Sequence, residues 1–515
     1  MGLASRTVRQ AREVESLTGW SAPWQGLRVA VLGLGVTGFS VADTLAELGA
    51  DATVFASSAD EKTADLLEVI GVPLVLADLQ SPDGHAESDL ETFAPELLVV
   101  SPGFPPRHPL VAWATDHGVP VWGDVELAWR LRDKTAAAPW LAITGTNGKT
   151  TTVQLTAAML TAAGRRIAAC GNVGMPVLDA IRDPAGFDAL VVELSSFQLH
   201  YIHSISPHAS VCLNIADDHL DWHGSAQAYR AAKAKVYRNT EAVCLFNRAD
   251  DATRAMVEEA DVVEGARAVG FGLGIPAPGD LGVVDGILCE RAFHKDYQRS
   301  AVELISIDRL AAAGLDSAHM VQNVLAAAGL ALSLGTPPSA IRTALGGFHV
   351  DHHRTQVVAE HGGIRWVDDS KATNPHAARA ALKSAPSVVW IVGGLFKGVD
   401  VAQLVESEAG RLRAAVLIGA ERGEVLAAFK RHAPALPVFE VDTVDTDQVM
   451  PTAVRLAAAV ARSGDTVLLA PAAASMDQFK NYADRGSRFA AAVNEMLGGG
   501  ADDDKPSSPA ASPQR

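Results

Sequence analysis

Residues 145–151 carry the groups that bind a phosphate. They read Gly-Thr-Asn-Gly-Lys-Thr-Thr and follow an apolar segment, Trp140 to Ile143, that predicts a buried strand. Glycines let backbone N–H groups converge on an anion, and the helix expected to begin at Lys149 adds its positive N-terminal end. Lys149 supplies a further charge, and the Thr150 hydroxyl can hold Mg²⁺. Ile143 stands where the usual P-loop has another glycine, so we expect a shortened phosphate-binding loop.

Polar residues recur after other expected strands. Glu193 ends an apolar segment, where a carboxylate suits a metal ion beside a phosphate. The run after the next strand contains Asp217, Asp218, His219, Asp221 and His223. Lys233 lies in a helical stretch, and Asp-Asp-Ser-Lys-Ala-Thr-Asn-Pro follows a strand at 368–375. Glu193, Lys233 or residues 368–375 alone would more often be a solvated surface feature, whereas histidines as dense as those at 219 and 223 rarely pack in a core. Their joint occurrence with the phosphate loop favours a catalytic site.

The first part of the chain predicts a βαβ unit. A strand at 27–32 is followed by Gly33, Gly35 and Gly38, then by a helix and a second strand at 52–55. Three glycines in this spacing suggest a nucleotide phosphate at the helix N-terminus. A dinucleotide oxidoreductase would carry an acidic residue after the second strand, where this chain has Ala-Ser-Ser at 56–58. A different nucleotide or a purely structural glycine turn stays open.

Alternating strands and helices predict an α/β fold with three domains. Further strands are expected at 97–100, 189–193, 209–214, 242–247, 365–367, 388–392, 415–418 and 466–469. The second domain should contain a hairpin turn at Asp285-Gly286 and an Ala-rich helix from about His319 to Leu334. We expect an N-terminal extension at 1–22, a Rossmann-like domain at 23–137, a central P-loop ATPase-like domain with a mostly parallel sheet at 138–348, a Rossmann-like C-terminal domain at 349–498 and a disordered tail at 499–515.

The composition indicates a globular enzyme. Of the 515 residues 48% are hydrophobic, and the formal net charge of −17 argues against a nucleic-acid groove. The four cysteines lack C-x-x-C spacing and lie near apolar runs, as expected of reduced core cysteines. The N-terminal residues lack an apolar signal segment, and the best candidate span, 324–334, is too short to cross a membrane. We therefore expect a cytoplasmic protein without nucleic acid or membrane insertion. We further expect a monomer that acts on small molecules.

Motifs along nearly the whole chain, from Gly33 to about Arg488, resemble the Mur ligase family, whose members add amino acids to a peptidoglycan precursor at the expense of ATP. In family order they are GTNGKTT at 145–151, ELSSFQL at 193–199, N-I-x-x-D-H-L-D-x-H at 214–223, His353-Arg354, DDSKATN at 368–374, GGLFKG at 393–398 and APAAASMDQF-x-N-Y-x-x-R-G at 470–486. Within the family, DSKATN and Ser-Met-Asp-Gln-Phe at 475–479 resemble the D-glutamate-adding branch.

The resemblance implies an ADP-forming acid–D-amino-acid ligase (peptide synthase). ATP would phosphorylate the carboxylate of UDP-N-acetylmuramoyl-L-alanine, and the amine of D-glutamate would attack the acyl phosphate. The first domain would hold the UDP part. The implied cofactors are ATP, two Mg²⁺ ions and CO2, which would carbamylate Lys233, because a protonated lysine cannot ligate a cation. Alignment on Tyr229 and Tyr237 favours Lys233 over Lys235.

The resemblance also implies roles for individual residues. The catalytic group would be Lys149, Glu193, His219 and Lys233, and the metal ligands Thr150, Glu193, His219 and Lys233. ATP would contact Gly145, Thr146, Asn147, Gly148, Lys149, Thr150, Thr151, Asn323, Arg354 and Asp369. UDP-N-acetylmuramoyl-L-alanine would contact Val36, Thr37, Ser101, Gly103, Asn172 and His219. D-Glutamate would contact Lys371, Thr373, Lys397, Ser475 and, through its backbone, Phe479. The chain departs from the family in two places. Met320 stands where the family has an Asn beside the adenine, and residues 56–58 lack the family's motif that contacts uracil.

Three other interpretations stay open. One is a different acceptor within the family, or a folylpolyglutamate synthetase that shares the second and third domains; the βαβ opening counts against the synthetase. Another is a dinucleotide oxidoreductase, which the missing acid and the Lys149 loop disfavour. The third is a non-catalytic nucleotide-binding scaffold, which predicts that Lys149→Ala, Glu193→Ala and Lys233→Ala leave function intact.

Overall fold

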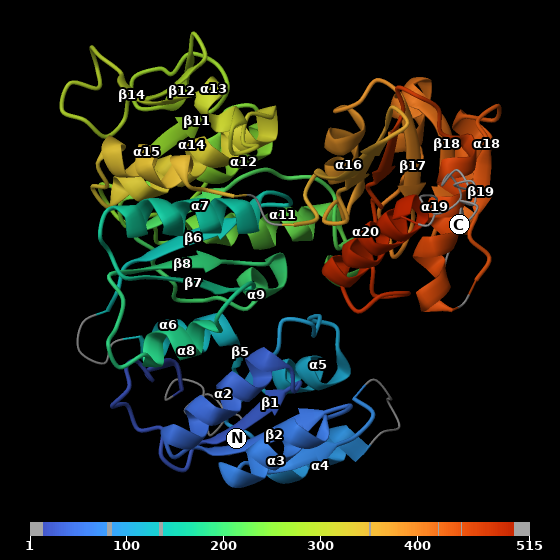
Figure 1. Ribbon diagram of the computed structural model, residues 1–515. Coiled ribbons are helices and arrows are strands. Elements are labelled where there is room, and N and C mark those ends of the chain that lie inside the picture. The colour runs from blue at the N-terminus through green and yellow to red at the C-terminus, as the bar shows by residue number, and fades with distance from the viewer. Residues whose placement is uncertain are drawn as a thin grey trace, which may run out of the picture. The chain divides into compact units, whose positions relative to one another are not determined.

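The computed structural model describes residues 14–79, 85–132, 137–349, 352–420, 422–443 and 445–498, which fold into alternating strands and helices (Figure 1). Their packing divides the chain into two compact units. The first unit comprises Met1–Ile215 and Ser225–His349, and the second comprises Ala216–Gly224 and Val350–Arg515. The described residues form three sheets, one in each of the three expected segments. The domain boundaries themselves stay a prediction, and residues 1–13 and 499–515 of the predicted extension and tail lie outside the described residues.

The first sheet is parallel, with strand order β3-β2-β1-β4-β5. Its strands are β1 (Arg28–Leu32), β2 (Asp51–Ala56), β3 (Leu74–Leu76), β4 (Leu97–Val100) and β5 (Val121–Gly123). Its helices are α2 (Val36–Glu47), α3 (Glu61–Val69), α4 (His85–Phe93), α5 (Pro109–Asp116) and α6 (Asp124–Leu131). The strand order reverses between β1 and β4, which is where open α/β sheets bind ligands. The predicted βαβ elements are confirmed.

The turn between β1 and α2 allows no side chain at its last glycine. A Cβ on Gly38 would lie 2.0 Å from the carbonyl oxygen of Gly33, whereas a Cβ on Gly35 would meet nothing within 4 Å. Ser101, after β4, donates a hydrogen bond to the Gly33 carbonyl at 3.4 Å. The spacing of the glycines therefore sets how closely α2 approaches the sheet, next to the turn that follows β4.

The central sheet has the strand order β14-β13-β12-β11-β10-β9-β6-β8-β7. It is parallel from β7 to β12 and antiparallel beyond, so the predicted mostly parallel sheet is confirmed. Its strands are β6 (Trp140–Thr144), β7 (Ile167–Gly171), β8 (Ala189–Glu193), β9 (Ala209–Cys212), β10 (Val243–Asn247), β11 (Arg267–Phe271), β12 (Leu281–Val284), β13 (Ile287–Glu290) and β14 (Val302–Ser306). The predicted hairpin turn at Asp285-Gly286 joins β12 to β13.

Helices cover the central sheet, with α14 and α15 packed on α7 (Figure 1). The helices of this segment are α7 (Lys149–Ala162), α8 (Val177–Arg182), α9 (Ser196–His200), α11 (Ala226–Ala234), α12 (Asp251–Glu258), α13 (Ile307–Ala311), α14 (Ala318–Ser333) and α15 (Pro338–Gly346), with a 3₁₀ turn η1 (Lys235–Tyr237). The short helix α10 (Leu220–His223) belongs to the second unit. Both predicted helices, at Lys149 and at 319–334, are confirmed.

The third sheet has the order β15-β16-β20-β17-β18-β19 and is parallel except for the β15–β16 hairpin. Its strands are β15 (Gln356–His361), β16 (Ile364–Asp368), β17 (Val388–Val392), β18 (Leu412–Leu417), β19 (Val438–Glu440) and β20 (Thr466–Leu469). Its helices are α16 (Pro375–Leu382), α17 (Ala402–Glu408), α18 (Gly423–His432), α19 (Thr446–Val460) and α20 (Tyr482–Gly498), with a 3₁₀ turn η2 (Ala409–Arg411). No described helix is long and apolar enough to span a membrane.

Candidate active site

The loop predicted to bind a phosphate joins β6 to α7. Gly148, at φ 85°, caps the helix, and Gly145 has φ 149°, both conformations that favour glycine. The Lys149 ammonium folds back over the loop and donates to the carbonyl oxygens of Gly145 and Thr146, each at 2.9 Å. The lysine charge and the helix N-terminus are therefore held at the same turn, as anion binding requires.

Asn214, just after β9, holds the loop from the side. Its carbonyl oxygen accepts from the Thr146 amide at 2.9 Å, and its side chain both accepts from the Asn147 amide at 2.9 Å and donates to the Asn147 carbonyl at 3.1 Å. The sequence singled out the run that starts at Asn214 but gave this residue no role. These contacts fix two successive peptides of the loop that is predicted to bind a phosphate.

Asn323 on α14 lies directly over the helix cap. A Cβ on Gly148 would come within 2.5 Å of the Asn323 side-chain oxygen, so this position must be glycine. The Asn323 amide faces the Met320 sulfur at 4.0 Å, the position where the chain departs from the family pattern. The structure thus brings Asn323 to the loop, although the two lie far apart in sequence.

Glu193, the last residue of β8, presents a carboxylate next to this loop, since it pairs with Ile143 of β6. This residue is 1% exposed, and its Oε1 accepts a hydrogen bond from the side-chain amide of Asn172 at 3.0 Å. Its Oε2 is buried and has no hydrogen-bond partner in the part of the chain that the structure describes. Since an unpaired buried carboxylate oxygen is costly, this donor fits a cation. Among the same residues, no three His, Cys, Asp or Glu side chains cluster as a metal site by themselves.

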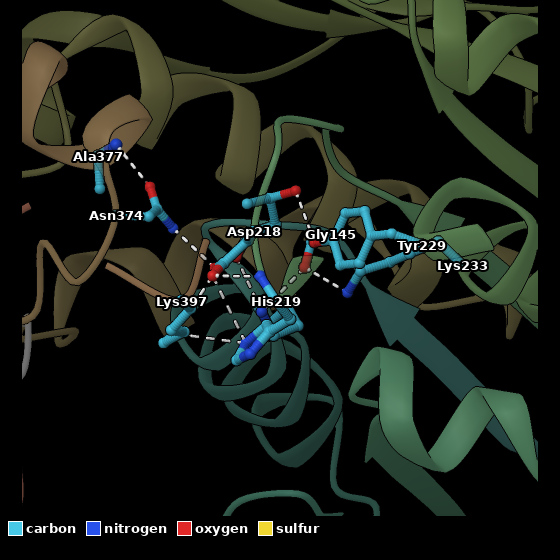
Figure 2. A network of polar contacts seen from close by, with 10 residues as sticks. Gly145, Asp218, His219, Tyr229, Lys233, Asn374, Ala377 and Lys397 are labelled. Carbon is cyan, nitrogen blue, oxygen red and sulfur yellow. Dashed lines mark hydrogen bonds and ion pairs between the residues drawn. The ribbon is translucent and has the colours of Figure 1, made fainter. Parts of the chain in front are cut away.

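Lys233 on α11 turns into the phosphate loop (Figure 2). Its ammonium donates to the Thr144 hydroxyl at 3.0 Å and to the Gly145 carbonyl at 2.8 Å, and its side chain is 2% exposed. Tyr229, one turn earlier, contacts the Thr146 hydroxyl at 2.9 Å through its own hydroxyl. Lys235 instead donates to the carbonyl of His200. An amine ligates a cation only without its proton, so the fit of Lys233 to a metal depends on its chemical form.

Another predicted metal ligand, His219, belongs to the second unit. It has φ 55° and lies beside Asp218, a carboxylate that is 5% exposed (Figure 2). Lys397, also at positive φ, donates to Asp218 at 3.2 Å and contacts His219 Nε2 at 3.4 Å. Asn374 donates to the other Asp218 oxygen at 3.2 Å. Three motifs distant in sequence therefore meet at one carboxylate, a role that sequence reasoning did not give to Asp218 or Asn374.

Loops after β16, β20 and β17 meet at one edge of the third sheet and carry the residues expected to bind the amino acid. Gly394 packs so closely on the Ala474 carbonyl that a Cβ would lie 2.2 Å from it. Arg485, fully buried, donates to the Ser370 hydroxyl and carbonyl and to the Ala473 carbonyl, at 2.9 to 3.1 Å. Burial lowers the pKa of this guanidinium to about 9. Arg485 thus ties two of the loops together, and only its place in a family motif hinted at it.

At this edge the amino-acid candidates differ in what they contact. Lys371 lies with its ammonium 3.7 Å from the centre of the Tyr482 ring, and Thr373 is half-buried. Ser475 is buried, and the Phe479 amide donates to its carbonyl at 2.8 Å while the Phe479 ring packs in the core. Of the Phe479 backbone, which was expected to contact D-glutamate, the N–H is therefore hydrogen-bonded within the chain.

Two further ATP candidates lie in the second unit. Asp369 follows β16, and its carboxylate accepts from the Thr355 amide at 3.1 Å. Burial raises the pKa of this carboxyl to about 7. Arg354 lies close enough to Asp369 to oppose that shift. The neighbouring Asp368 carboxylate contacts His353 Nδ1 at 2.6 Å.

The candidates for the UDP part lie in the first unit. Val36, 76% exposed, begins α2, with Thr37 next to it, and Ser101 touches the same glycine turn. Gly103 is open to solvent. Asn172 lies instead at the other sheet, against Glu193. The structure therefore brings Val36, Thr37 and Ser101 to one edge and Asn172 to Glu193.

Known proteins resemble this chain over most of its length. Three family models match in succession: a Mur ligase MurD-like N-terminal domain at 27–123, a Mur ligase middle domain at 143–331 and a Mur ligase glutamate ligase domain at 353–473. The chain belongs to the Mur ligase family. A solved pseudomurein peptide ligase type C from Methanothermus fervidus, 17% identical, has a TM-score of 0.54 over 91% of this chain and 100% of its own. It supports the fold, a three-domain α/β architecture with mostly parallel sheets.

Two curated relatives resemble the chain more closely. Both are named UDP-N-acetylmuramoylalanine--D-glutamate ligase. The one from Leifsonia xyli subsp. xyli is 63% identical over 95% of this chain and 96% of its own length. The one from Streptomyces avermitilis is 51% identical over 92% of this chain and 99% of its own length.

Proposed function

We propose that this chain is an ATP-dependent ligase that adds D-glutamate to UDP-N-acetylmuramoyl-L-alanine through an acyl phosphate, in peptidoglycan precursor synthesis. The observation that carries the proposal is the 63% identity, over 95% of the chain, to a relative named for that reaction. The site supports it independently, because a phosphate loop, a buried carboxylate and a lysine converge in the first unit.

In the proposed reaction the loop at 145–151 and Lys149 hold the transferred phosphoryl group. Its developing negative charge would be met by the loop amides and by the ammonium of Lys149, now directed at two carbonyl oxygens. A positioned positive charge in a water-poor site stabilises such a transition state more than the same charge does in water. Asn214 keeps the loop amides aimed before the nucleotide arrives.

One Mg²⁺ would be held by Thr150 and Glu193, and a second by Glu193, His219 and a carbamylated Lys233. Both would neutralise charge on the phosphates. The unpaired Glu193 Oε2 supports a cation at this point. In its ammonium form Lys233 is a donor to Thr144 and Gly145. Carbamylation by CO2 would add a carboxylate group to this nitrogen, and an oxygen of that group would be the anionic ligand.

The two organic substrates would occupy the sheet edges described above. The uridine diphosphate would lie at Val36, Thr37, Ser101 and Gly103, and Asn172 and His219 would face the muramoyl-alanine carboxylate. D-Glutamate would be bound by Lys371, Thr373, Lys397, Ser475 and Phe479. The adenine, ribose or phosphates of ATP would meet Asn323, Arg354 and Asp369. Positively charged Lys371 and Lys397 suit an acceptor with two carboxylates. We place the enzyme in the cytoplasm as a monomer that acts on small molecules, with domain boundaries near residues 137 and 348.

The test is phosphate release from ATP and Mg²⁺ in the presence of UDP-N-acetylmuramoyl-L-alanine. D-Glutamate, L-glutamate, L-alanine and meso-diaminopimelate are compared as acceptors. Release that depends on D-glutamate alone is expected. Release with another amino acid would keep the chemistry and overturn the acceptor assignment, and no release with any of them would overturn the ligase proposal.

A further inference from the structure

Asp124 is a buried carboxylate that the proposed chemistry does not use. It is the first residue of α6, its side chain is 4% exposed, and its Oδ1 lacks a hydrogen-bond partner among the described residues. Burial raises the pKa of this carboxyl to about 6, against a usual value of 3.8. Such a group costs folding free energy unless its contacts compensate for it, so the partner of its other oxygen is informative.

That partner is Gln198, which controls the turn after Glu193. The Gln198 side-chain N–H donates to Asp124 Oδ2 at 3.2 Å. Its side-chain oxygen accepts from the Ser195 amide at 3.1 Å, while its own amide donates to the Ser195 hydroxyl at 3.1 Å. This is a capping box at the start of α9. Asp124 therefore orients the amide group that fixes Ser195, two residues beyond Glu193.

The same turn is tied to the phosphate loop. The Leu194 carbonyl accepts from the Thr144 hydroxyl at 2.6 Å, and the Leu194 amide donates to the Ile143 carbonyl at 2.9 Å. The Lys233 ammonium donates in turn to the Thr144 hydroxyl at 3.0 Å. A continuous path of hydrogen bonds and backbone thus runs from α6, beside the first sheet, to Glu193 and Lys233.

We propose that Asp124 is a positioning residue: through Gln198 and Ser195 it aims the Glu193 carboxylate and the Thr144–Lys233 pair. The proposal rests on the metal role given to Glu193 under the proposed function. Groups that orient a metal ligand from outside its coordination sphere typically change metal affinity or activity by about 10- to 100-fold when removed. The N-terminal segment, expected to bind the UDP part, would thereby also set the geometry of the phosphoryl-transfer site.

The test compares Asp124→Ala, which removes the acceptor, with Asp124→Asn, which keeps an acceptor oxygen for Gln198. Ser204→Ala is the matched control. The Ser204 hydroxyl donates at 2.6 Å to Oε1 of Glu126, which is on α6 like Asp124 but outside the hydrogen-bonded path to Glu193. Hydrogen exchange of residues 194–199 is measured without nucleotide. The Mg²⁺ concentration for half-maximal D-glutamate-dependent phosphate release is measured on the same proteins.

We expect Asp124→Ala to speed exchange at 194–199 and to raise the Mg²⁺ requirement about 10-fold or more, with Asp124→Asn and Ser204→Ala near wild type in both. If Asp124→Ala does not fold, Asp124→Ser, too short to reach Gln198, takes its place. Exchange and Mg²⁺ requirement unchanged in a folded Asp124→Ala or Asp124→Ser protein would overturn the proposal. A wild-type protein without D-glutamate-dependent release would instead overturn the proposed function, and the exchange result would still decide whether Asp124 holds the turn.

Discussion

Glu193 keeps one carboxylate oxygen buried and unpaired among the described residues, while the other accepts from Asn172. A glutamine there would keep the Asn172 contact and remove the charge. We predict that Glu193→Gln leaves thermal stability equal to wild type or higher, because no buried charge remains to be desolvated. Ligase activity should fall about 100-fold or more, since charge stabilisation at the phosphates is lost. Thermal melting and phosphate release at several Mg²⁺ concentrations check this, and retained activity would exclude Glu193 as a metal ligand.

Lys233 gives a second prediction at the scale of one residue. If its carbamate supplies an anionic ligand, Lys233→Ala should abolish D-glutamate-dependent phosphate release, and a short-chain carboxylic acid in the buffer should restore part of it. Lys235→Ala is the matched control, because the Lys235 ammonium donates to His200 rather than to the phosphate loop. Full activity of Lys233→Ala at low Mg²⁺ would rule out the carbamate.

The third residue-scale prediction concerns pH and Asp124. Its pKa is raised to about 6 in the folded protein, from a usual 3.8. Between these values the folded protein binds more protons here than the unfolded chain, so stability falls as pH rises through this window. Asp124→Asn cannot titrate. The free energy of unfolding of Asp124→Asn should therefore rise relative to that of wild type between pH 4 and pH 7, by up to about 3 kcal/mol. Melting temperatures of both proteins across this range check the difference. A constant difference across this range would contradict the shift.

At the scale of elements, the β1–α2 turn distinguishes two glycines in one motif. Gly38→Ala would place a Cβ 2.0 Å from the Gly33 carbonyl oxygen, whereas Gly35→Ala meets nothing within 4 Å. Because backbone must move to admit the first methyl group, we predict a loss of about 3 kcal/mol or more for Gly38→Ala. Gly35→Ala should stay within about 0.5 kcal/mol of wild type. Chemical denaturation of both variants provides the comparison, and equal losses would show that the turn rearranges freely.

Elements were more predictable than contacts between them. Buried strands such as β8 and β17 begin and end at the predicted residues. An unbroken apolar run bounded by polar groups marks both ends of a strand. Short edge strands such as β3 and β19 carry no such signal, and β15 was missed because its residues alternate weakly and are half-exposed. The loop at 145–151 was evident because its chemistry is local.

The roles of Asp218, Asn214 and Arg485 were not predicted, since each depends on partners brought near by the fold. Asp218 meets Asn374 and Lys397, Asn214 meets the phosphate loop, and Arg485 meets Ser370. Each lies inside a motif that the sequence identified. A motif therefore located the site, while the tertiary structure alone showed what these side chains contact.

At the scale of the whole molecule, the division into two compact units predicts how the protein melts. Separate units of unequal size need not unfold together. We predict two calorimetric transitions, one of which rises by a few degrees with Mg²⁺ and a non-hydrolysable ATP analogue at about 100 times its Kd. Lys149→Ala should abolish that rise while keeping both transitions, because the loop lies in the first unit. A single transition would show that the units unfold as one.

The stretch Ala216–Gly224 is surrounded in sequence by the first unit but packs with the second. During synthesis Asp218 leaves the ribosome 179 residues ahead of Lys397, its partner. At ordinary translation speeds this is an interval on the order of 10–30 s. For most of this interval the nascent chain holds Asp218 while neither Asn374 nor Lys397 has been made. A gene divided near residue 350 would consequently place Asp218 and His219 on one polypeptide and Asn374 and Lys397 on the other, so the two halves would have to reassemble to form that site.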